Sequence, residues 1–173
     1  DTFNNPAIRE QFKVDNYSDI LDDEESKEYD ILAKDRVLAK EFNGERYRCV
    51  ADNKGVLKVK LRELCNGHIE LSSHNNDTIL DNVQCDKAKQ LEMLLTNHVN
   101  NSIIYYEFDN DLPIIEKELC KLRINYKIVN GHTSKKNSAK YIEEFKQNHI
   151  RILVMQSKSG NAGLDLTNTN NII

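Results

Sequence analysis

Apolar residues between positions 86 and 173 alternate between helical spacing and short continuous runs, and this alternation limits the fold more than any other feature. A helix followed by a strand three times over is typical of right-handed βαβ units and a parallel sheet. The sequence therefore predicts an α/β domain over residues 86–173. The expected segments are a helix over 86–97, a strand over 103–108, a helix with Pro113 in its first turn, a strand over 126–129, a helix from Ser134 or Asn137, and a strand over 150–155.

The last of these runs, 150–155, is the strongest strand signal. It is rich in β-branched residues and bounded by polar sequence, which predicts a central strand buried on both faces. The residues that follow, 157–163, are mostly small and hydroxylated, so little side chain lies between their backbone N–H groups and a docking phosphate. Open parallel sheets bind ligands beyond the carboxyl ends of their strands. Two glycines at a strand end are equally typical of an ordinary turn.

Residues 1–85 have a different pattern. The segment 1–27 is acidic with few apolar residues and predicts an extended or partly ordered lead-in. Residues 28–85 predict a mostly helical appendage. Its expected parts are a helix over 26–41, a turn at Asn43-Gly44, a short strand or hairpin arm around Tyr47 to Ala51, a helix over 54–65 that stops at Asn66-Gly67, and irregular polar sequence over 68–84 that contains a polar loop at 72–77.

The charge of −4 is unevenly distributed. Residues 1–30 hold ten Asp or Glu and three Lys or Arg, a net charge of −7, which leaves +3 for the rest. Any nucleic-acid contact is therefore expected from the later part. No apolar run has the length of a membrane span and no signal-peptide pattern is present, so we expect a soluble cytoplasmic protein. Because Asp1 is not an initiator methionine, we also expect a fragment.

The cysteines do not form a Cys-x-x-Cys pair, so reduced thiols are expected. Cys65, His68, His74 and Cys85 could in principle supply four zinc ligands, but Cys65 falls on the apolar face of a predicted helix, and we expect no metal site. His68 and His132 each follow an Asn-Gly turn and are expected to be solvated. No convergent set of acid, base and nucleophile is present, so no catalytic residue is predicted.

Several segments together resemble one family. They are 101–108, 131–134 with 142–145, and 154–167 with Ile172-Ile173. These segments look like the motifs of the second RecA-like lobe of superfamily-two helicases, most similar to the Swi/Snf-type branch with its bacterial and bacteriophage members. Residues 58–69 resemble the helix-then-glycine segment that precedes that lobe. The resemblance covers about residues 28–173 and implies a RecA-like parallel sheet flanked by helices.

The resemblance also implies roles for individual residues. One loop corresponds to motif V, which lies against DNA phosphates, and a second loop also contacts the DNA backbone. The aromatic residues Tyr105 and Phe108 match motif IV, and we expect them in the core because a strand in mid-sheet needs large apolar residues. The implied DNA contacts are Ser157, Lys158, Ser159 and Gly160 in the first loop and Gly131, Ser134 and Lys136 in the second; the implied nucleotide contacts are Gly163 and Asp165.

The sequence also departs from the family pattern. It has no Gly-x-x-x-x-Gly-Lys-[Ser/Thr] loop and no Asp-Glu pair on a strand, so ATP and Mg²⁺ would be held through a first lobe. It stops at Ile173, before the position of the arginine-rich motif VI, and Lys136-Asn137-Ser138 stands where relatives often have an arginine. We expect no ATP hydrolysis by this chain alone. The expected partners are the backbone of double-stranded DNA and the first RecA-like lobe, with no membrane.

One alternative stays open on the sequence. It is a non-catalytic α/β module that binds protein or nucleic acid, with the acidic lead-in docking a basic partner.

Overall fold

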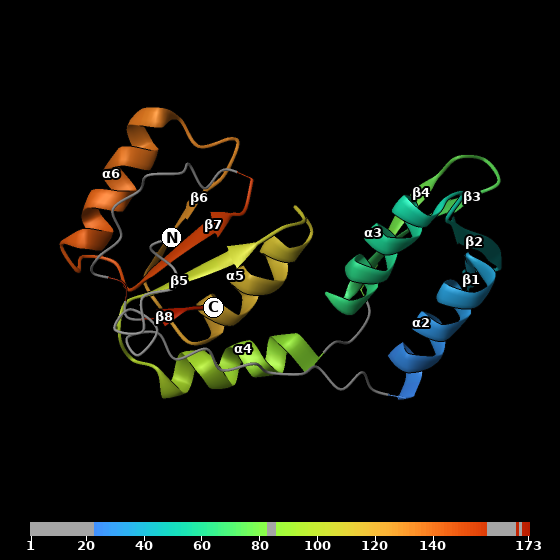
Figure 1. Ribbon diagram of the computed structural model, residues 1–173, viewed down its shortest axis with the longest axis horizontal. Helices are drawn as coiled ribbons and strands as arrows, with labels where there is room; N and C mark the ends of the chain where they lie inside the picture. Colours follow the sequence, from blue (N-terminus) through green and yellow to red (C-terminus); the bar gives the residue numbers. More distant parts are fainter. Residues whose placement is uncertain (1–22, 83–85, 159–168, 170) are drawn as a thin grey trace, which may run out of the picture.

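The computed structural model describes residues 23–82, 86–158, 169 and 171–173. Within them the chain forms two sheets, a parallel one and an antiparallel one, each covered by helices (Figure 1). In chain order the elements are α2 (Asp23–Asp35), β1 (Val37–Phe42), β2 (Glu45–Val50), α3 (Lys54–Cys65), β3 (His68–Ser73), β4 (Thr78–Asn82), α4 (Asp86–Asn97), β5 (Ser102–Tyr106), α5 (Asp111–Lys121), β6 (Tyr126–Val129), α6 (Lys135–Lys146), β7 (Ile152–Gln156) and β8 (Asn171–Ile172).

The second half of the chain is an α/β domain, as the alternating pattern predicts. Its strand order is β6-β7-β5-β8, and each neighbouring pair is parallel. Strand β7 lies between β5 and β6, and its residues 152–155 are fully buried. The prediction of a central strand is therefore confirmed. Its continuous apolar run follows from burial on both faces, since neither face needs polar residues.

Helices cover both faces of this sheet. Leu91 and Leu95 of α4 and Leu119 of α5 pack on one face, together with Ile104 and Val154 of the strands. Phe145 of α6 packs on the other face, against Ile103, Val129, Leu153 and Met155. Successive residues of β5 therefore point to opposite layers, as the pleat of a strand requires. Figure 1 shows α6 on one side of the strands and α4 and α5 on the other.

The appendage is not mostly helical, and this prediction is wrong. Its strands form an antiparallel sheet of order β1-β2-β3-β4, and α2 and α3 cover one face. The core holds Leu32 and Leu64 from the helices and Leu38, Ile69 and Leu71 from the strands. The two predicted helices are present, but the strands between and after them supply more than half of the secondary structure of residues 37–82.

Two local features explain the error. The helix expected over 26–41 ends at Asp35, because Arg36 adopts a left-handed conformation with φ of 56°, and residues 37–42 continue as β1. The turn at Asn43-Gly44 is confirmed; its two positive φ angles, 53° and 79°, close a two-residue hairpin between β1 and β2. Residues 68–82, expected to be irregular polar sequence with a loop at 72–77, form a hairpin of β3 and β4 whose turn holds Asn76 at positive φ.

No helix in the described ranges has the length and apolar character that a membrane crossing requires.

Candidate functional site

Three loops meet at one edge of the parallel sheet, where β5, β7 and β6 end. The strands run in the same direction and in register, with Tyr106 opposite Gln156 and Val129 opposite Met155. Their carboxyl ends therefore lie side by side. We name this edge the strand-tip edge and define it by residues 107–110, 130–134 and 157–158. It is the position at which open parallel sheets bind ligands.

The loop after β7 begins with Ser157 and Lys158, two of the predicted DNA contacts. The backbone N–H and the hydroxyl of Ser157 both donate to the carbonyl oxygen of Tyr106, at 2.8 and 2.9 Å. The side-chain amide of Gln156 donates to Asp109 at 2.8 Å, so the start of the loop is tied to the loop after β5. A phosphate that accepted from Ser157 would have to replace the Tyr106 carbonyl. Lys158 is exposed.

The other predicted residues of that loop are not placed. Ser159 and Gly160, predicted to contact DNA, and Gly163 and Asp165, predicted to contact nucleotide, lie outside the described residues. Their roles stay predictions.

The loop after β6 holds the second predicted DNA contact. Asn130 organises it: its side-chain oxygen accepts from the backbone N–H of His132 at 3.0 Å, and its own N–H donates to the Thr133 hydroxyl at 3.1 Å. Ser134 then caps α6 by accepting from the N–H of Asn137 at 3.2 Å. Apart from its two chain neighbours, no atom of the described residues lies within 4 Å of a Cβ built on Gly131, so this backbone faces open space.

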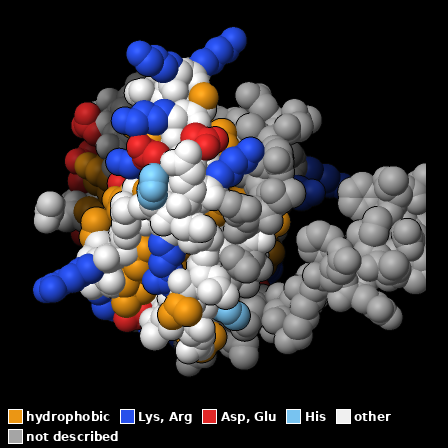
Figure 2. All heavy atoms as spheres, turned by 90° about the vertical axis from the view of Figure 1, so that its left-hand side faces the viewer, with side chains coloured by type: hydrophobic (Ala, Val, Ile, Leu, Met, Phe, Trp, Pro, Cys, Tyr) orange, Lys and Arg blue, Asp and Glu red, His pale blue; other side chains and the backbone are white. Residues whose placement is uncertain are grey.

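The N-terminal end of α6 is electropositive. A helix N-terminus carries a partial positive charge, and here the first turn contains Lys135 and Lys136 and no acidic residue. Both lysines are exposed. Figure 2 views the molecule from the α6 side, and Lys and Arg side chains project around its top, the level at which α6 begins in Figure 1. An anion at this end would relieve the repulsion between the lysines and the helix dipole.

A polar groove of about 560 Å³ lies beside this helix, between β6 and α6. Its lining includes Ser134, and the ammonium of Lys127 lies 5.4 Å from the ring centre of Tyr141. Tyr126 donates to Glu116 at 2.9 Å, and burial, with the contacts to Cys120 and Glu116, raises the pKa of its hydroxyl. That hydroxyl is therefore neutral at physiological pH.

Sequence reasoning missed Asp111, whose side chain makes several contacts near the strand-tip edge. Its carboxylate is buried at the start of α5 and accepts from the backbone N–H groups of Glu107 and Phe108, at 3.3 and 2.9 Å. The other carboxylate oxygen lies 2.8 Å from Nε2 of His68 and accepts from the Asn66 amide at 3.0 Å. The local sequence Asn-Asp-Leu-Pro does indicate a helix start at this position, but not the contact with residues more than forty positions earlier.

Three further predictions are corrected by these contacts. His68 is not solvated: it is 1% exposed and faces Asp111, because residue 68 begins β3 instead of a loop. Tyr105 is 39% exposed and does not belong to the core. Phe108 lies beyond the end of β5 and contacts the His68 ring edge-on, with centres 5.9 Å apart. His132 is exposed, as expected.

The zinc hypothesis finds no support in the described ranges. His68 is engaged by Asp111, His74 is exposed at the β3–β4 turn, and Cys85 lies outside those ranges. No group of three or more His, Cys, Asp or Glu residues within them could hold a metal ion.

Comparisons with known proteins agree with this architecture. The profile of the helicase conserved C-terminal domain matches residues 86–173. ATP-dependent helicase fft2 of Schizosaccharomyces pombe is 23% identical over 156 residues, which are 88% of this chain and 12% of that protein.

Two solved structures are also similar. The C-terminal part of the Fun30 ATPase domain is 24% identical over 50% of this chain and 28% of that chain, with a TM-score of 0.43. The Sulfolobus solfataricus SWI2/SNF2 ATPase C-terminal domain is 22% identical over 50% of this chain and 39% of that chain, with a TM-score of 0.42. This chain thus spans a small part of the proteins it matches. Because the profile covers more than half of the sequence, and because those residues form a parallel sheet flanked by helices, the chain belongs to the family of the helicase conserved C-terminal domain.

Proposed function

We propose that residues 86–173 act as the second RecA-like lobe of a Swi/Snf-type, ATP-dependent DNA translocase, and that the strand-tip edge lies against the DNA backbone. One observation carries the proposal. The strands β6 and β7 end side by side, so the loop after β6 and the first two residues of the loop after β7, Ser157 and Lys158, lie at the same edge of one sheet although they are far apart in sequence. Lys158 is exposed there, and Lys136 is exposed in the first turn of α6, which begins directly after residue 134.

The chemistry of this edge suits phosphate better than bases. The edge offers Lys158 and the open backbone at Gly131, and the N-terminus of α6 beside it adds Lys136. These groups recognise negative charge and carry no information about base sequence. A motor that moves along DNA needs such contacts, because it must bind every sequence that it passes.

The appendage belongs to the same proposed motor. The similarity to the yeast helicase extends over 156 residues, more than the domain of residues 86–173 can supply. At least part of residues 1–85 therefore resembles that protein too. We assign the appendage to the segment that joins the two lobes.

ATP and Mg²⁺ would bind mainly through a first lobe. This chain has no phosphate-binding Gly-x-x-x-x-Gly-Lys loop and no Asp-Glu strand, the parts that hold the phosphates and the metal. Its own proposed contribution to the nucleotide is Gly163 and Asp165. A two-lobe cleft would then place the nucleotide between the first lobe and this one.

The proposal is tested by DNA affinity. Lys158→Ala and Lys136→Ala are compared with Lys117→Ala, which removes an exposed lysine in the middle of α5, away from the strand-tip edge. We expect the first two variants to bind three duplexes of unrelated sequence roughly five- to tenfold more weakly, as for one lost charge-assisted contact. The control should bind like the wild type. A loss confined to one duplex, or equal losses in all three variants, would contradict the proposal.

A further inference from the structure

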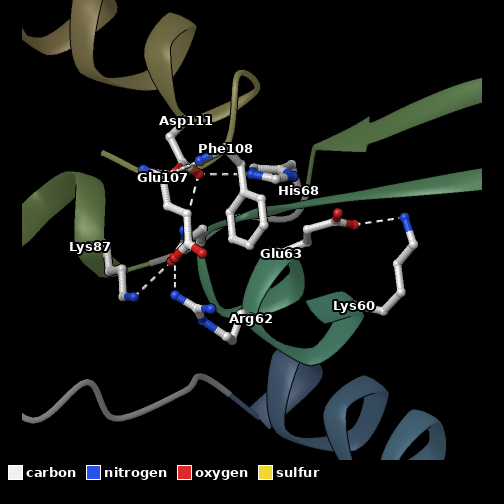
Figure 3. A network of polar contacts seen from close by, with 9 residues as sticks. Lys60, Arg62, Glu63, His68, Lys87, Glu107, Phe108 and Asp111 are labelled. Carbon is white, nitrogen blue, oxygen red and sulfur yellow. Dashed lines mark hydrogen bonds and ion pairs between the residues drawn. The ribbon is translucent and has the colours of Figure 1, made fainter. Parts of the chain in front are cut away.

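The contact between the appendage and the parallel-sheet domain is polar and centres on one buried carboxylate. Asp111 is 8% exposed, and its two carboxylate oxygens contact different parts of the protein. One oxygen binds the appendage, through His68 and Asn66. The other binds the backbone N–H groups of Glu107 and Phe108 in the loop after β5. Figure 3 shows that His68, at the start of β3, and the loop after β5 both face the Asp111 side chain.

Other side chains of the appendage reach the same loop. The guanidinium of Arg62, on α3, donates to the carboxylate of Glu107 and lies 5.6 Å from the ring centre of Phe108 (Figure 3). From the side of the parallel-sheet domain, Lys87 on α4 donates to the Asn66 side chain of the appendage at 2.8 Å. The appendage therefore holds residues 107–108 from two elements, α3 and β3. We call this set of contacts the joint and define it by residues 62, 66, 68, 87, 107, 108 and 111.

The joint leads directly to the strand-tip edge. The loop that Asp111 binds follows Tyr106, whose carbonyl oxygen accepts both donors of Ser157. The same loop continues to Asp109, which accepts from Gln156 at the end of β7. The backbone of residues 106–109, with its hydrogen bonds to Asp111 on one side and to Gln156 and Ser157 on the other, thus connects the appendage to the start of the loop after β7.

Capping of α5 does not explain these contacts. A cap accepts from the first N–H groups inside a helix, whereas Asp111 accepts from the N–H groups of Glu107 and Phe108, which precede α5. Asp111 instead buries a carboxylate, which is unfavourable unless both oxygens are hydrogen-bonded. A buried polar network of this kind favours one geometry over the many that an apolar contact would tolerate.

We propose that Asp111 is a positioning residue that fixes the appendage relative to the parallel sheet and thereby holds the strand-tip edge in its DNA-binding shape. The proposal rests on the proposed function for its second part. Its first part, a rigid joint, does not depend on DNA.

Asp111→Asn separates the two sides of the carboxylate. An asparagine has one acceptor oxygen, so it can bind either the loop or the appendage, and its NH₂ group then faces donors on the other side. Glu118→Gln is the matched control, because Glu118 is a second carboxylate of α5 that is 7% exposed and pairs with Lys121 at 3.6 Å on the same helix. Arg62→Gln is a second test variant, chosen because the Arg62 side chain is 50% exposed and its loss does not open the core.

The first measurement is the relative orientation of the two sheets, from residual dipolar couplings of backbone amides. In the wild type and in Glu118→Gln, amides of β1–β4 and of β5–β7 should fit one alignment tensor. In Asp111→Asn and Arg62→Gln they should require two tensors. A single tensor in both test variants, or two tensors in Glu118→Gln, would overturn the proposal.

The second measurement is the affinity for duplex DNA. We expect Asp111→Asn to lower it about fivefold or more, the lower end of usual coupling between sites, with no change in Glu118→Gln. If Lys158→Ala weakens binding and Asp111→Asn does not, the positioning role is wrong and the proposed function stands. If Lys158→Ala has no effect, the proposed function and the DNA part of this inference fail together, and the dipolar couplings alone decide the rigid joint.

Discussion

Replacing Leu153 by alanine tests the central place of β7. The Leu153 side chain is fully buried, between the strands β5 and β6 and beneath α6, where it packs with Phe145 and Ile103. Truncation removes three carbon atoms from a site whose neighbours are held on both sides by strand pairing. The site can collapse only partly, so we expect a loss of about 3 kcal/mol from the free energy of unfolding, within the usual range for buried leucine.

Urea denaturation followed by circular dichroism measures this loss. For a chain of this size, a loss of about 3 kcal/mol moves the midpoint by roughly 1–2 M urea at an unchanged slope. Val99→Ala is the control, because Val99 is 73% exposed and its truncation should change stability by less than about 0.5 kcal/mol. If Leu153→Ala shifted the midpoint no more than Val99→Ala, the strand would not be central and the order of the sheet would be wrong.

Two further predictions concern the appendage. Lys40 contacts Asp81 at 2.7 Å and Glu28 at 2.5 Å; burial alone would lower its pKa, but these carboxylates outweigh burial and raise it. Lys40→Met should therefore lower the free energy of unfolding by about 1–2 kcal/mol at neutral pH. This difference from the wild type should persist up to the ordinary lysine pKa of 10.5 and shrink above it. A difference that already shrinks between pH 7 and 9 would contradict the assignment. Asn53 caps α3 by accepting from the N–H groups of Gly55 and Val56 at 2.9 and 3.0 Å. Asn53→Ala should therefore lower the free energy of unfolding, measured by urea denaturation, by about 1 kcal/mol. An unchanged midpoint would show that this cap is not formed.

The parallel sheet could be predicted because its signals are local. The run over 150–155 is apolar on both faces, and such a strand has few alternatives. The position of the strand-tip edge then follows from topology, since the carboxyl ends of parallel strands meet at one edge. The turn at Asn43-Gly44 was equally local, because these residues favour positive φ.

The antiparallel sheet was harder to predict because its strands do not show a clear apolar alternation. Ser73 shares the inner face of β3 with Ile69 and Leu71, and His68 on the opposite face is buried against Asp111, so polar residues hide the pattern. The apolar spacing of α2 also continues into β1, and only the left-handed Arg36 separates them. The contact between His68 and Asp111 joins residues 43 positions apart, and no local pattern indicates such a pair.

The salt dependence of binding to duplex DNA tests the central claim most directly. If the strand-tip edge contacts phosphates, the logarithm of the association constant should fall linearly with the logarithm of the salt concentration, and Lys158→Ala should reduce the magnitude of that slope by about 1. The Lys117→Ala control should keep the wild-type slope. A slope that Lys158→Ala leaves unchanged would contradict the account, because the lysine would then not contact the DNA backbone.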